Sequence, residues 1–335
     1  MAKKFVGPPD RSAYLPPNLP SERSDGHFVP DQHLLARIPC TRYWHFERRP
    51  VVNDLPPPGV PAWLRRFDWL VGWEHGWAST SEFPKSVFCH PNALPDFVRF
   101  LRTNFSAGVR KGSVIAFGGE DTNLSAQNLE DLKEVSSFFE GIYYEAKDIQ
   151  HPFVQTMVCG VNEFYCRGHE ELFRSLIASP NAKKPTIVAG WGAWWPKLND
   201  SIRDRQEAIQ LSKSSDLVDF GVSDFPDWLE RLHQQQFMLC PLGNGVQAPK
   251  MIEALLLRCI PILTDYPASR ELKRIGLPIV VVRSWSDIDR SLLQKVSKDL
   301  IPKMEEFHQK LLDLDDWWEF SFGTFNRERA ITTAT

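Results

Sequence analysis

The stretch that decides the fold lies at residues 237–263 and reads FMLCPLGNGVQAPKMIEALLLRCIPIL. An apolar run that ends at Cys240 predicts a buried strand, and the apolar run that closes the stretch predicts another. The loop between them contains Gly243 and Gly245, which let a backbone approach a ligand closely. A helix is expected over 249–258, because proline suits a first helical position. The stretch therefore predicts a strand, loop, helix and strand of a parallel sheet, with the free N–H groups of the helix directed at the loop.

The same alternation of strands and helices continues on both sides of this stretch. Further strands are expected over 67–73, 113–117, 141–144, 185–190, 217–220 and 277–282. Further helices are expected over 94–105, 129–139, 172–178, 202–212, 226–235, 285–298 and 302–320. Regular alternation of this kind is typical of a doubly wound α/β fold. A chain of 335 residues is long enough for about two such domains, and their boundary is expected between 160 and 184.

The composition excludes several classes of protein. Hydrophobic residues make up 42% of the chain, and 22 Phe and 12 Trp supply too much apolar surface for a mainly disordered protein. Lys and Arg total 39 against 42 Asp and Glu, so the chain lacks the overall positive charge that nucleic acid attracts. No apolar run approaches the roughly 20 residues of a membrane span, and none follows the N-terminal lysines as a secretory signal would require. We therefore expect a cytoplasmic protein, of a bacterium or a virus-infected cell, without a nucleic acid partner.

The first 61 residues differ from the rest, because they hold twelve of the 26 prolines. Proline fixes φ and removes a backbone donor, so this segment is expected to be an extended Pro-rich arm. The six cysteines are scattered without a CxxC pair, which argues against zinc and for a reducing compartment. Asp287 and Asp289 have the Asp-x-Asp spacing of a metal-binding motif, but they fall at an expected helix start, away from the glycine loop. We therefore expect neither a metal nor a cofactor.

Lys250 and Glu253 lie three residues apart in the first turn of the expected helix, so they share one helix face. A cation there would suit the diphosphate of a nucleotide, and a carboxylate would suit ribose hydroxyls. Such pairs are also common on solvated helix surfaces, where the helix dipole alone favours a Glu near the start. The pair by itself leaves both interpretations open.

The same stretch resembles the C-terminal signature of the exostosin-like glycosyltransferases, the GT47 type. In that signature an apolar strand leads into Cys, Pro and Gly, then a loop, a basic residue, Glu-Ala-Leu, and a strand with Cys-Ile-Pro. The residues that carry the resemblance are 239–243, Lys250, 253–255 and 259–263. The family usually has Arg where Lys250 stands and Gly where Arg258 stands. The first change keeps the charge but weakens a bidentate grip on phosphate, and the second alters packing near the helix end.

The resemblance implies the GT-B architecture, in which two Rossmann-like domains with parallel sheets face a central cleft. It divides the chain into the Pro-rich arm 1–61, an acceptor-side domain 62–165, a nucleotide-sugar-binding domain 166–300 and a C-terminal helix 301–335 that crosses back to the first domain. It also implies an activity. By this resemblance the chain is expected to transfer a hexosyl or pentosyl group from a nucleotide sugar, most often a UDP-sugar, to a hydroxyl of a carbohydrate or glycan acceptor. The transfer is expected to invert the anomeric centre and to need no metal.

Candidate donor-binding residues gather in the second half of the chain. Two arginines follow an expected strand, and arginine matches the geometry of phosphate well. With the glycine loop and the Lys–Glu pair, the expected donor-binding set is Arg203, Arg205, Gly243, Asn244, Gly245, Lys250 and Glu253. Either arginine could also be an ordinary surface residue.

Candidate catalytic and acceptor-binding residues follow strands of the first half. An inverting transferase needs a general base that deprotonates the acceptor hydroxyl, and the candidates are Glu74, His75 and Asp121. Trp73 and Trp77 flank the first two and are expected to bind the acceptor sugar. The alternatives are structural: Asp121 as a helix cap and Glu74 as a solvated side chain.

Two other functions stay open on such a fold. A non-catalytic carbohydrate-binding protein would bind sugars without affinity for nucleotides. A nucleotide-sugar epimerase, or a phosphorylase-like enzyme, would be a third possibility, and an epimerase would act on the donor without any acceptor. A NAD dehydrogenase is disfavoured, because no G-x-G-x-x-G follows a first strand.

Overall fold

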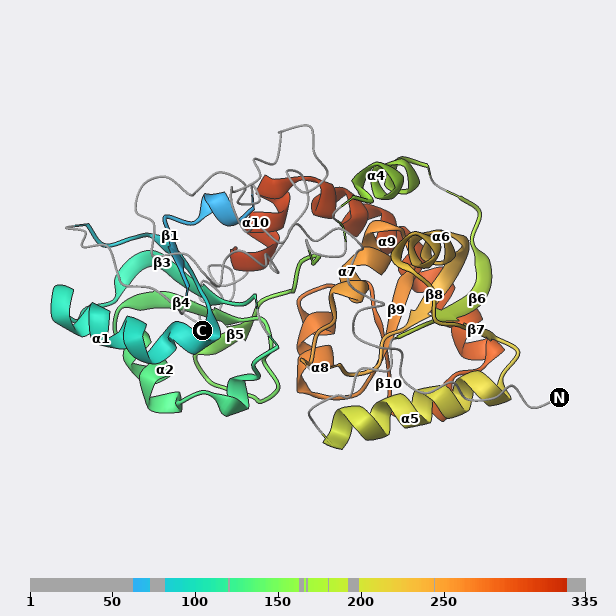
Figure 1. Ribbon diagram of the computed structural model, residues 1–335, viewed down its shortest axis with the longest axis horizontal. Coiled ribbons are helices and arrows are strands. Elements are labelled where there is room, and N and C mark those ends of the chain that lie inside the picture. The colour runs from blue at the N-terminus through green and yellow to red at the C-terminus, as the bar shows by residue number, and fades with distance from the viewer. Residues whose placement is uncertain are drawn as a thin grey trace, which may run out of the picture.

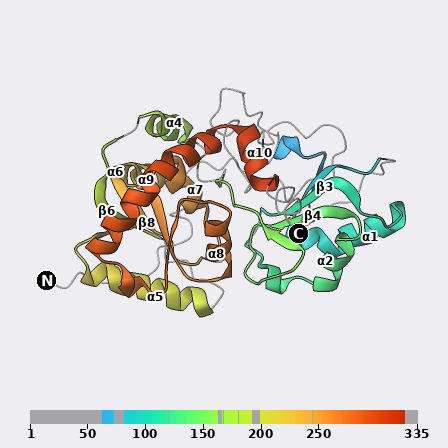
Figure 2. The same ribbon diagram turned by 180° about the vertical axis from the view of Figure 1, so that it is seen from behind.

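The computed structural model describes residues 63–72, 82–119, 121–162, 166, 168–179, 181–191, 199–243 and 245–323. These residues form two five-stranded sheets in which neighbouring strands run parallel, with helices packed around both (Figures 1 and 2). The expected α/β class, with two parallel Rossmann-like sheets, is confirmed. The arm 1–61 and five site candidates lie outside the described residues: Trp73, Glu74, His75, Trp77 and Asn244.

The elements follow one another along the chain as strand, helix and strand. The strands are β1 (Trp69–Val71), β2 (Ser86–Cys89), β3 (Arg110–Phe117), β4 (Phe139–Tyr144), β5 (Val154–Thr156), β6 (Lys184–Ala189), β7 (Val218–Phe220), β8 (Gln235–Leu239), β9 (Ile260–Thr264) and β10 (Val280–Val282). The helices are α1 (Leu94–Asn104), α2 (Leu129–Val135), α4 (Glu170–Ala178), α5 (Asn199–Ser214), α6 (Phe225–Gln234), α7 (Pro249–Leu256), α8 (Pro267–Arg274), α9 (Arg290–Leu312) and α10 (Leu314–Phe322).

The first sheet has the order β1-β2-β3-β4-β5 and is buried on both faces. Successive side chains of a strand point to opposite faces. Val87 and Ile142 belong to a cluster that includes the apolar residues of α1 and α2. Their neighbours Phe88 and Tyr143 belong to the other cluster, which includes residues of α10. The sheet is therefore covered by local helices on one face and by the C-terminal helix of the chain on the other.

The second sheet has the order β10-β9-β8-β6-β7. From β6 the chain crosses to β7 on one side, and it later returns to place β8 on the other side of β6. Such a reversal of strand order is where open parallel sheets bind ligands, beyond the carboxyl ends of the two diverging strands. α5 lies along one side of this sheet (Figure 1), and α6 and α7 pack against the strands β8 and β9.

The C-terminal helices differ from their expected bounds. The expected helix 285–298 begins only at Arg290, because Asp289 accepts a hydrogen bond from Leu292 N and caps it, while Asp287 lies in a short 3-10 turn. The expected break before Pro302 is wrong, because α9 continues through it. Pro302 is exposed, so water can hydrate the carbonyl that its missing N–H leaves unbonded. The chain breaks instead at Asp313, whose carboxylate caps α10.

α10 returns to the first sheet. The hydroxyl of Tyr143 in β4 donates to Phe322 O at 3.0 Å. The ring of Trp318 lies 4.9 Å from that of Phe67, centroid to centroid. None of the helices in the described part of the chain combines the length and the apolar composition that a bilayer crossing requires.

α7 ends in a tight turn at Arg258, the position where the signature that this stretch resembles has glycine. Cys259 N donates to Ala254 O at 2.8 Å, and Arg258 N donates to Leu255 O at 3.1 Å, which is the Schellman pattern of a helix C-terminus. This pattern requires a left-handed residue, and Arg258 has a φ of 57°. Glycine adopts that conformation without strain. The glycine of the family therefore fits the backbone better, and the Arg258 side chain offsets the strain by donating to Ile177 O at 3.0 Å and Glu305 at 2.8 Å.

Candidate active site

The glycine loop and the first turn of α7 lie where the order of the second sheet reverses, since β8 and β6 are neighbours there. Gly190 directly follows β6, and the ammonium of Lys250 donates to its carbonyl at 2.9 Å. The same ammonium lies 4.3 Å from the centroid of the Trp228 ring. Burial lowers the pKa of Lys250. An ammonium has three donors, and the hydrogen bonds of the described residues use one of them, which leaves a desolvated cation able to bind an anion.

Glu253 lies beneath Lys250 in the interior. Glu253 is 1% exposed, and its Oε2 accepts a hydrogen bond from Trp228 Nε1 at 3.1 Å. Burial raises the pKa of Glu253 to about 7, against the lowering effects of the Lys250 charge and the indole hydrogen bond. The interpretation of Lys250 and Glu253 as a solvated surface pair is therefore wrong. A buried carboxylate beside a partly buried ammonium is costly to maintain, which is typical of sites that act on a ligand.

Of the two candidate arginines in α5, one reaches the glycine loop. Arg205 Nε donates to Leu242 O at 2.8 Å, and a Cβ placed on Gly243 would lie 3.4 Å from Arg205 Nη2. Arg203 lies on the outer surface with a side chain 72% exposed, and it pairs with Asp200 at 3.3 Å. The donor-binding role expected for Arg203 has no support in its position.

Asp204 anchors the glycine loop from below, although nothing in the sequence singles it out. Its carboxylate accepts hydrogen bonds from Leu242 N at 2.7 Å, Thr264 Oγ1 at 2.9 Å and Trp285 Nε1 at 2.8 Å. Burial raises its pKa, although these three hydrogen bonds act in the opposite direction. Its partners come from three separate elements, so its role depends on the tertiary structure.

The structure brings one candidate base of the first half against the glycine loop of the second. Asp121 lies in the loop after β3, and a Cβ placed on Gly245 would lie 3.0 Å from Asp121 Oδ1. The loop of Asp121 is held by Glu145, a carboxylate with no exposed surface that accepts from Gly119 N at 3.0 Å. Asp121 also contributes to the electrostatics of Arg205. Loops beyond the carboxyl ends of β3 and β8 thus meet directly.

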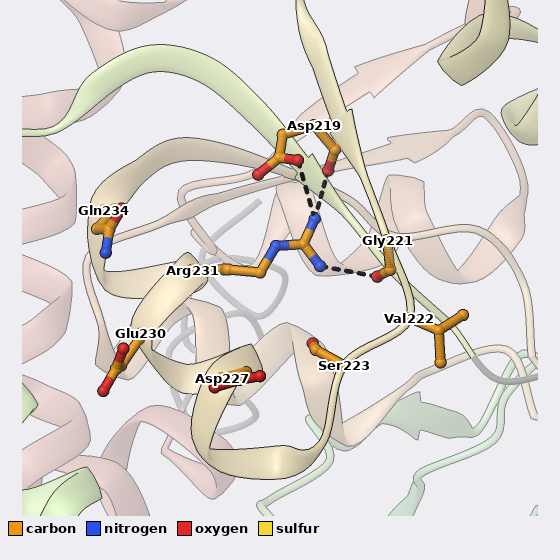
Figure 3. A pocket seen from close by; sticks show the side chains of 8 residues that line it. All are labelled: Asp219, Gly221, Val222, Ser223, Asp227, Glu230, Arg231 and Gln234. Carbon is orange, nitrogen blue, oxygen red and sulfur yellow. Dashed lines mark hydrogen bonds and ion pairs between the residues drawn. The ribbon is translucent and has the colours of Figure 1, made fainter.

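A pocket of about 360 Å³ opens between the end of β7 and α6 (Figure 3). Its lining residues are Asp219, Gly221, Val222, Ser223, Asp227, Glu230, Arg231 and Gln234. Arg231 crosses its floor and donates to Gly221 O at 2.7 Å and to Asp219 O at 2.6 Å. Gly190 packs so closely that a Cβ would lie 2.5 Å from Gly221 O. Gly190 thus contacts Lys250 on one side and Gly221, which lines the pocket, on the other.

The charge of the pocket suits one kind of ligand better than another. Three carboxylates and one guanidinium line it, and the guanidinium is already bonded to main-chain carbonyls and to the Asp219 carboxylate at 3.4 Å. Phosphate would be repelled here. Ser223 Oγ is buried and has no hydrogen-bond partner among the described residues. An uncharged polar group that offers N–H or O–H donors fits this surface.

Comparison with known proteins gives a weak likeness to one curated relative. No family model matches the chain. The chain is 24% identical over 135 residues to a probable glucuronosyltransferase of rice, Oryza sativa subsp. japonica. The match covers 38% of this chain and 30% of the rice protein, so it spans less than a third of that relative.

Solved structures give a similar picture. The trehalose 6-phosphate synthase of Burkholderia multivorans is 11% identical with a TM-score of 0.35, and the likeness covers 74% of this chain and 72% of that one. The sucrose-phosphate synthase of Thermosynechococcus elongatus is 12% identical with a TM-score of 0.36, over 75% and 74%. At such scores these likenesses add nothing to the fold assignment, which rests on the two parallel sheets and their strand orders.

Proposed function

We propose that the chain is a glycosyltransferase that moves a sugar from a nucleotide-sugar donor to a hydroxyl of a carbohydrate acceptor. The observation that carries the proposal is the partly buried ammonium of Lys250 in the first turn of α7, at the reversal of strand order. Ala248 offers no side-chain cap to α7, so the helix N-terminus and the ammonium together favour an anion. A diphosphate is the anion that a nucleotide sugar brings.

The donor would lie along the second half of the chain, which we propose as the nucleotide-sugar-binding domain. Lys250 and Arg205 bind the diphosphate, and Gly243, Asn244 and Gly245 let the backbone approach it. Glu253 accepts from the ribose hydroxyls. The uncharged base lies in the pocket at Gly221 and Ser223, where a second phosphate would be repelled. Uracil offers an N–H donor to that acidic lining, which favours UDP as the nucleotide.

The acceptor would lie against the first half, and Asp121 is the proposed base among the described residues. The base takes the proton of the acceptor hydroxyl, and the oxygen attacks the anomeric carbon as its bond to the diphosphate breaks. Attack opposite the leaving group inverts the anomeric centre. Lys250 and Arg205 stabilise the negative charge of the departing diphosphate, so the proposal needs no metal. Glu74 and His75 remain alternative bases, with Trp73 and Trp77 as acceptor-binding residues.

Calorimetric titration with UDP, GDP, ADP and a panel of UDP-sugars, with and without Mg²⁺, tests this proposal. UDP-glucuronic acid belongs in the panel, because the rice relative is a probable glucuronosyltransferase. We expect metal-independent binding of UDP that weakens at least tenfold in Lys250→Ala and Glu253→Ala. Arg203→Ala is the matched control, since this arginine is exposed, and it should bind as the wild type does.

Three outcomes would contradict the proposal. Absence of nucleotide binding by the wild type would leave a carbohydrate-binding protein as the better interpretation. Conversion of the bound nucleotide sugar to its epimer without an acceptor would indicate an epimerase. Equal weakening in Arg203→Ala and Lys250→Ala would move the donor site away from the start of α7.

A further inference from the structure

Gln247 connects the two halves of the chain through its side chain. It lies in the glycine loop of the second half, two residues before α7, and is 3% exposed. Its Nε2 donates to Glu145 O at 2.6 Å and to Met157 O at 2.8 Å, and its Oε1 accepts from Cys159 N at 3.0 Å. Both amide hydrogens and the amide oxygen are thus bonded to the main chain of the first half.

The partners of Gln247 lie where the strands of the first sheet end. Glu145 directly follows β4, and Met157 directly follows β5. The last hydrogen bond between these strands runs from Met157 N to Tyr144 O at 3.1 Å. Beyond it, the Gln247 amide bridges the ends of β4 and β5, in place of a further hydrogen bond between the two strands. A primary amide is suited to this task, because it presents two donors and an acceptor as a pair of peptide groups does.

The same residues hold the loop of the proposed base. Gln247 binds the main chain of Glu145, and the Glu145 carboxylate binds Gly119 N, two residues before Asp121. Gly118 leaves no room for adjustment there, since a Cβ would lie 2.6 Å from Glu145 Oε2. The glycine loop and the Asp121 loop are therefore held against each other twice: through Gln247 and Glu145, and by the direct approach of Gly245 to Asp121.

We propose that Gln247 is a positioning residue, which sets the donor-binding loop in register with the base loop across the junction of the two halves. The inference rests on the proposed function. The residues that would hold the donor, Lys250, Glu253 and Arg205, all belong to the second half and make no contact with Gln247 in the hydrogen bonds described. Donor affinity should therefore not depend on Gln247, whereas the transfer step, which needs the first half, should.

The test compares Gln247→Glu with Gln236→Glu. The first change replaces an N–H₂ group by an oxygen that faces two carbonyl oxygens across the junction, so it breaks the connection without changing side-chain size. The second is a matched control, because Gln236 is also buried, at 8% exposed, and donates to Ser297 Oγ at 3.0 Å within the second half. Gln247→Asn keeps the amide but is one methylene shorter, and it serves if the glutamate variant does not fold.

Two quantities are measured on the full chain for each variant. The dissociation constant for UDP comes from calorimetry. The rate of UDP release from the tightest-binding nucleotide sugar, with water as the acceptor, comes from a coupled assay normalised to folded protein. For Gln247→Glu we expect at least a tenfold loss of the release rate with UDP affinity within threefold of the wild type. Gln236→Glu should leave both within threefold.

The outcomes separate the two proposals. Loss of UDP affinity in Gln247→Glu to the same extent as its rate would overturn the positioning role, since the residue would then belong to donor binding. Equal loss of rate in both glutamate variants would also overturn it, because a general effect of a buried carboxylate would suffice. Failure of the wild type to bind UDP would instead overturn the proposed function itself.

Discussion

The ammonium of Lys250 lies over the face of the Trp228 indole, 4.3 Å from the ring centroid. The edge of the same indole donates to the carboxylate of Glu253. One aromatic ring thus contacts both side chains, since its face attracts cations and its N–H attracts carboxylates. Among the described residues the two signature side chains thus share Trp228 and make no direct ion pair.

The hydrogen bond of that indole can be tested with Trp228→Phe. Phenylalanine keeps an aromatic face for Lys250 but leaves the Glu253 carboxylate without its hydrogen-bond donor. The free energy of unfolding should therefore fall by about 1–3 kcal/mol. Trp317→Phe is the control, because Trp317 Nε1 is buried without a partner in the described part of the chain. Urea denaturation of both variants measures the difference. A cost no larger than that of Trp317→Phe would contradict the assigned hydrogen bond.

The raised pKa of Glu253 predicts a pH dependence of stability. Its pKa is about 7 in the folded chain, against 4.5 for a glutamate carboxyl in water, so folding favours the protonated form. The stabilisation is complete below pH 4.5 and is lost as the pH rises through 7. Glu253→Gln cannot ionise, so between pH 4.5 and 8 it should gain about 3 kcal/mol relative to the wild type. Urea denaturation at both pH values measures this difference in the free energy of unfolding, and Glu230→Gln, at an exposed position, is the control. A pH-independent difference would contradict it.

The contact between the loops can be tested at two glycines. In Gly245→Ala the new Cβ would lie 3.0 Å from Asp121 Oδ1 and 3.5 Å from Asp121 Cα, so the base loop must shift. In Gly243→Ala the nearest atom is Arg205 Nη2 at 3.4 Å, the end of a flexible side chain. We expect about a tenfold or greater loss of UDP release from a bound UDP-sugar in the first variant, because small displacements of reacting groups slow catalysis strongly. A rate in Gly245→Ala equal to that of the wild type would argue against Asp121 as the base.

The left-handed backbone at Arg258 predicts which of two variants at this position is the more stable. Arg258→Ala removes the bonds to Ile177 and Glu305 but keeps the strain of a φ of 57°. Arg258→Gly removes the same bonds and the strain. The glycine variant should therefore be more stable than the alanine variant by about 1 kcal/mol, with thermal unfolding as the measurement. Equal midpoints for the two variants would show that the turn is not strained.

Strands and helices with a clear pattern could be predicted from the sequence, and short buried ones could not. β3, β4, β6, β8 and β9 lie where the apolar runs predict them. β2 and β5 were not predicted, because their three or four residues are buried by neighbours distant in sequence and have no alternating pattern of their own. α8 was missed because its first turn lacks an apolar period, although Glu271 and Leu272 are buried by the first half and the sheet. The continuation of α9 through Pro302 depends on the exposure of this proline to solvent, which no local sequence pattern reveals.

Periodicity and residue type within thirty positions were enough to predict the α/β class, the signature loop with Lys250 and Glu253, and the glycines that a close backbone approach requires. Only the tertiary structure decided that Glu253 is buried against Trp228, that Arg205 rather than Arg203 reaches the loop, and that Asp121 meets Gly245. It also decided the roles of Asp204, Glu145 and Gln247. Hydrogen bonds between residues 26 to 102 positions apart leave no local pattern, because the sheets that bring their partners together are assembled from strands far apart in sequence.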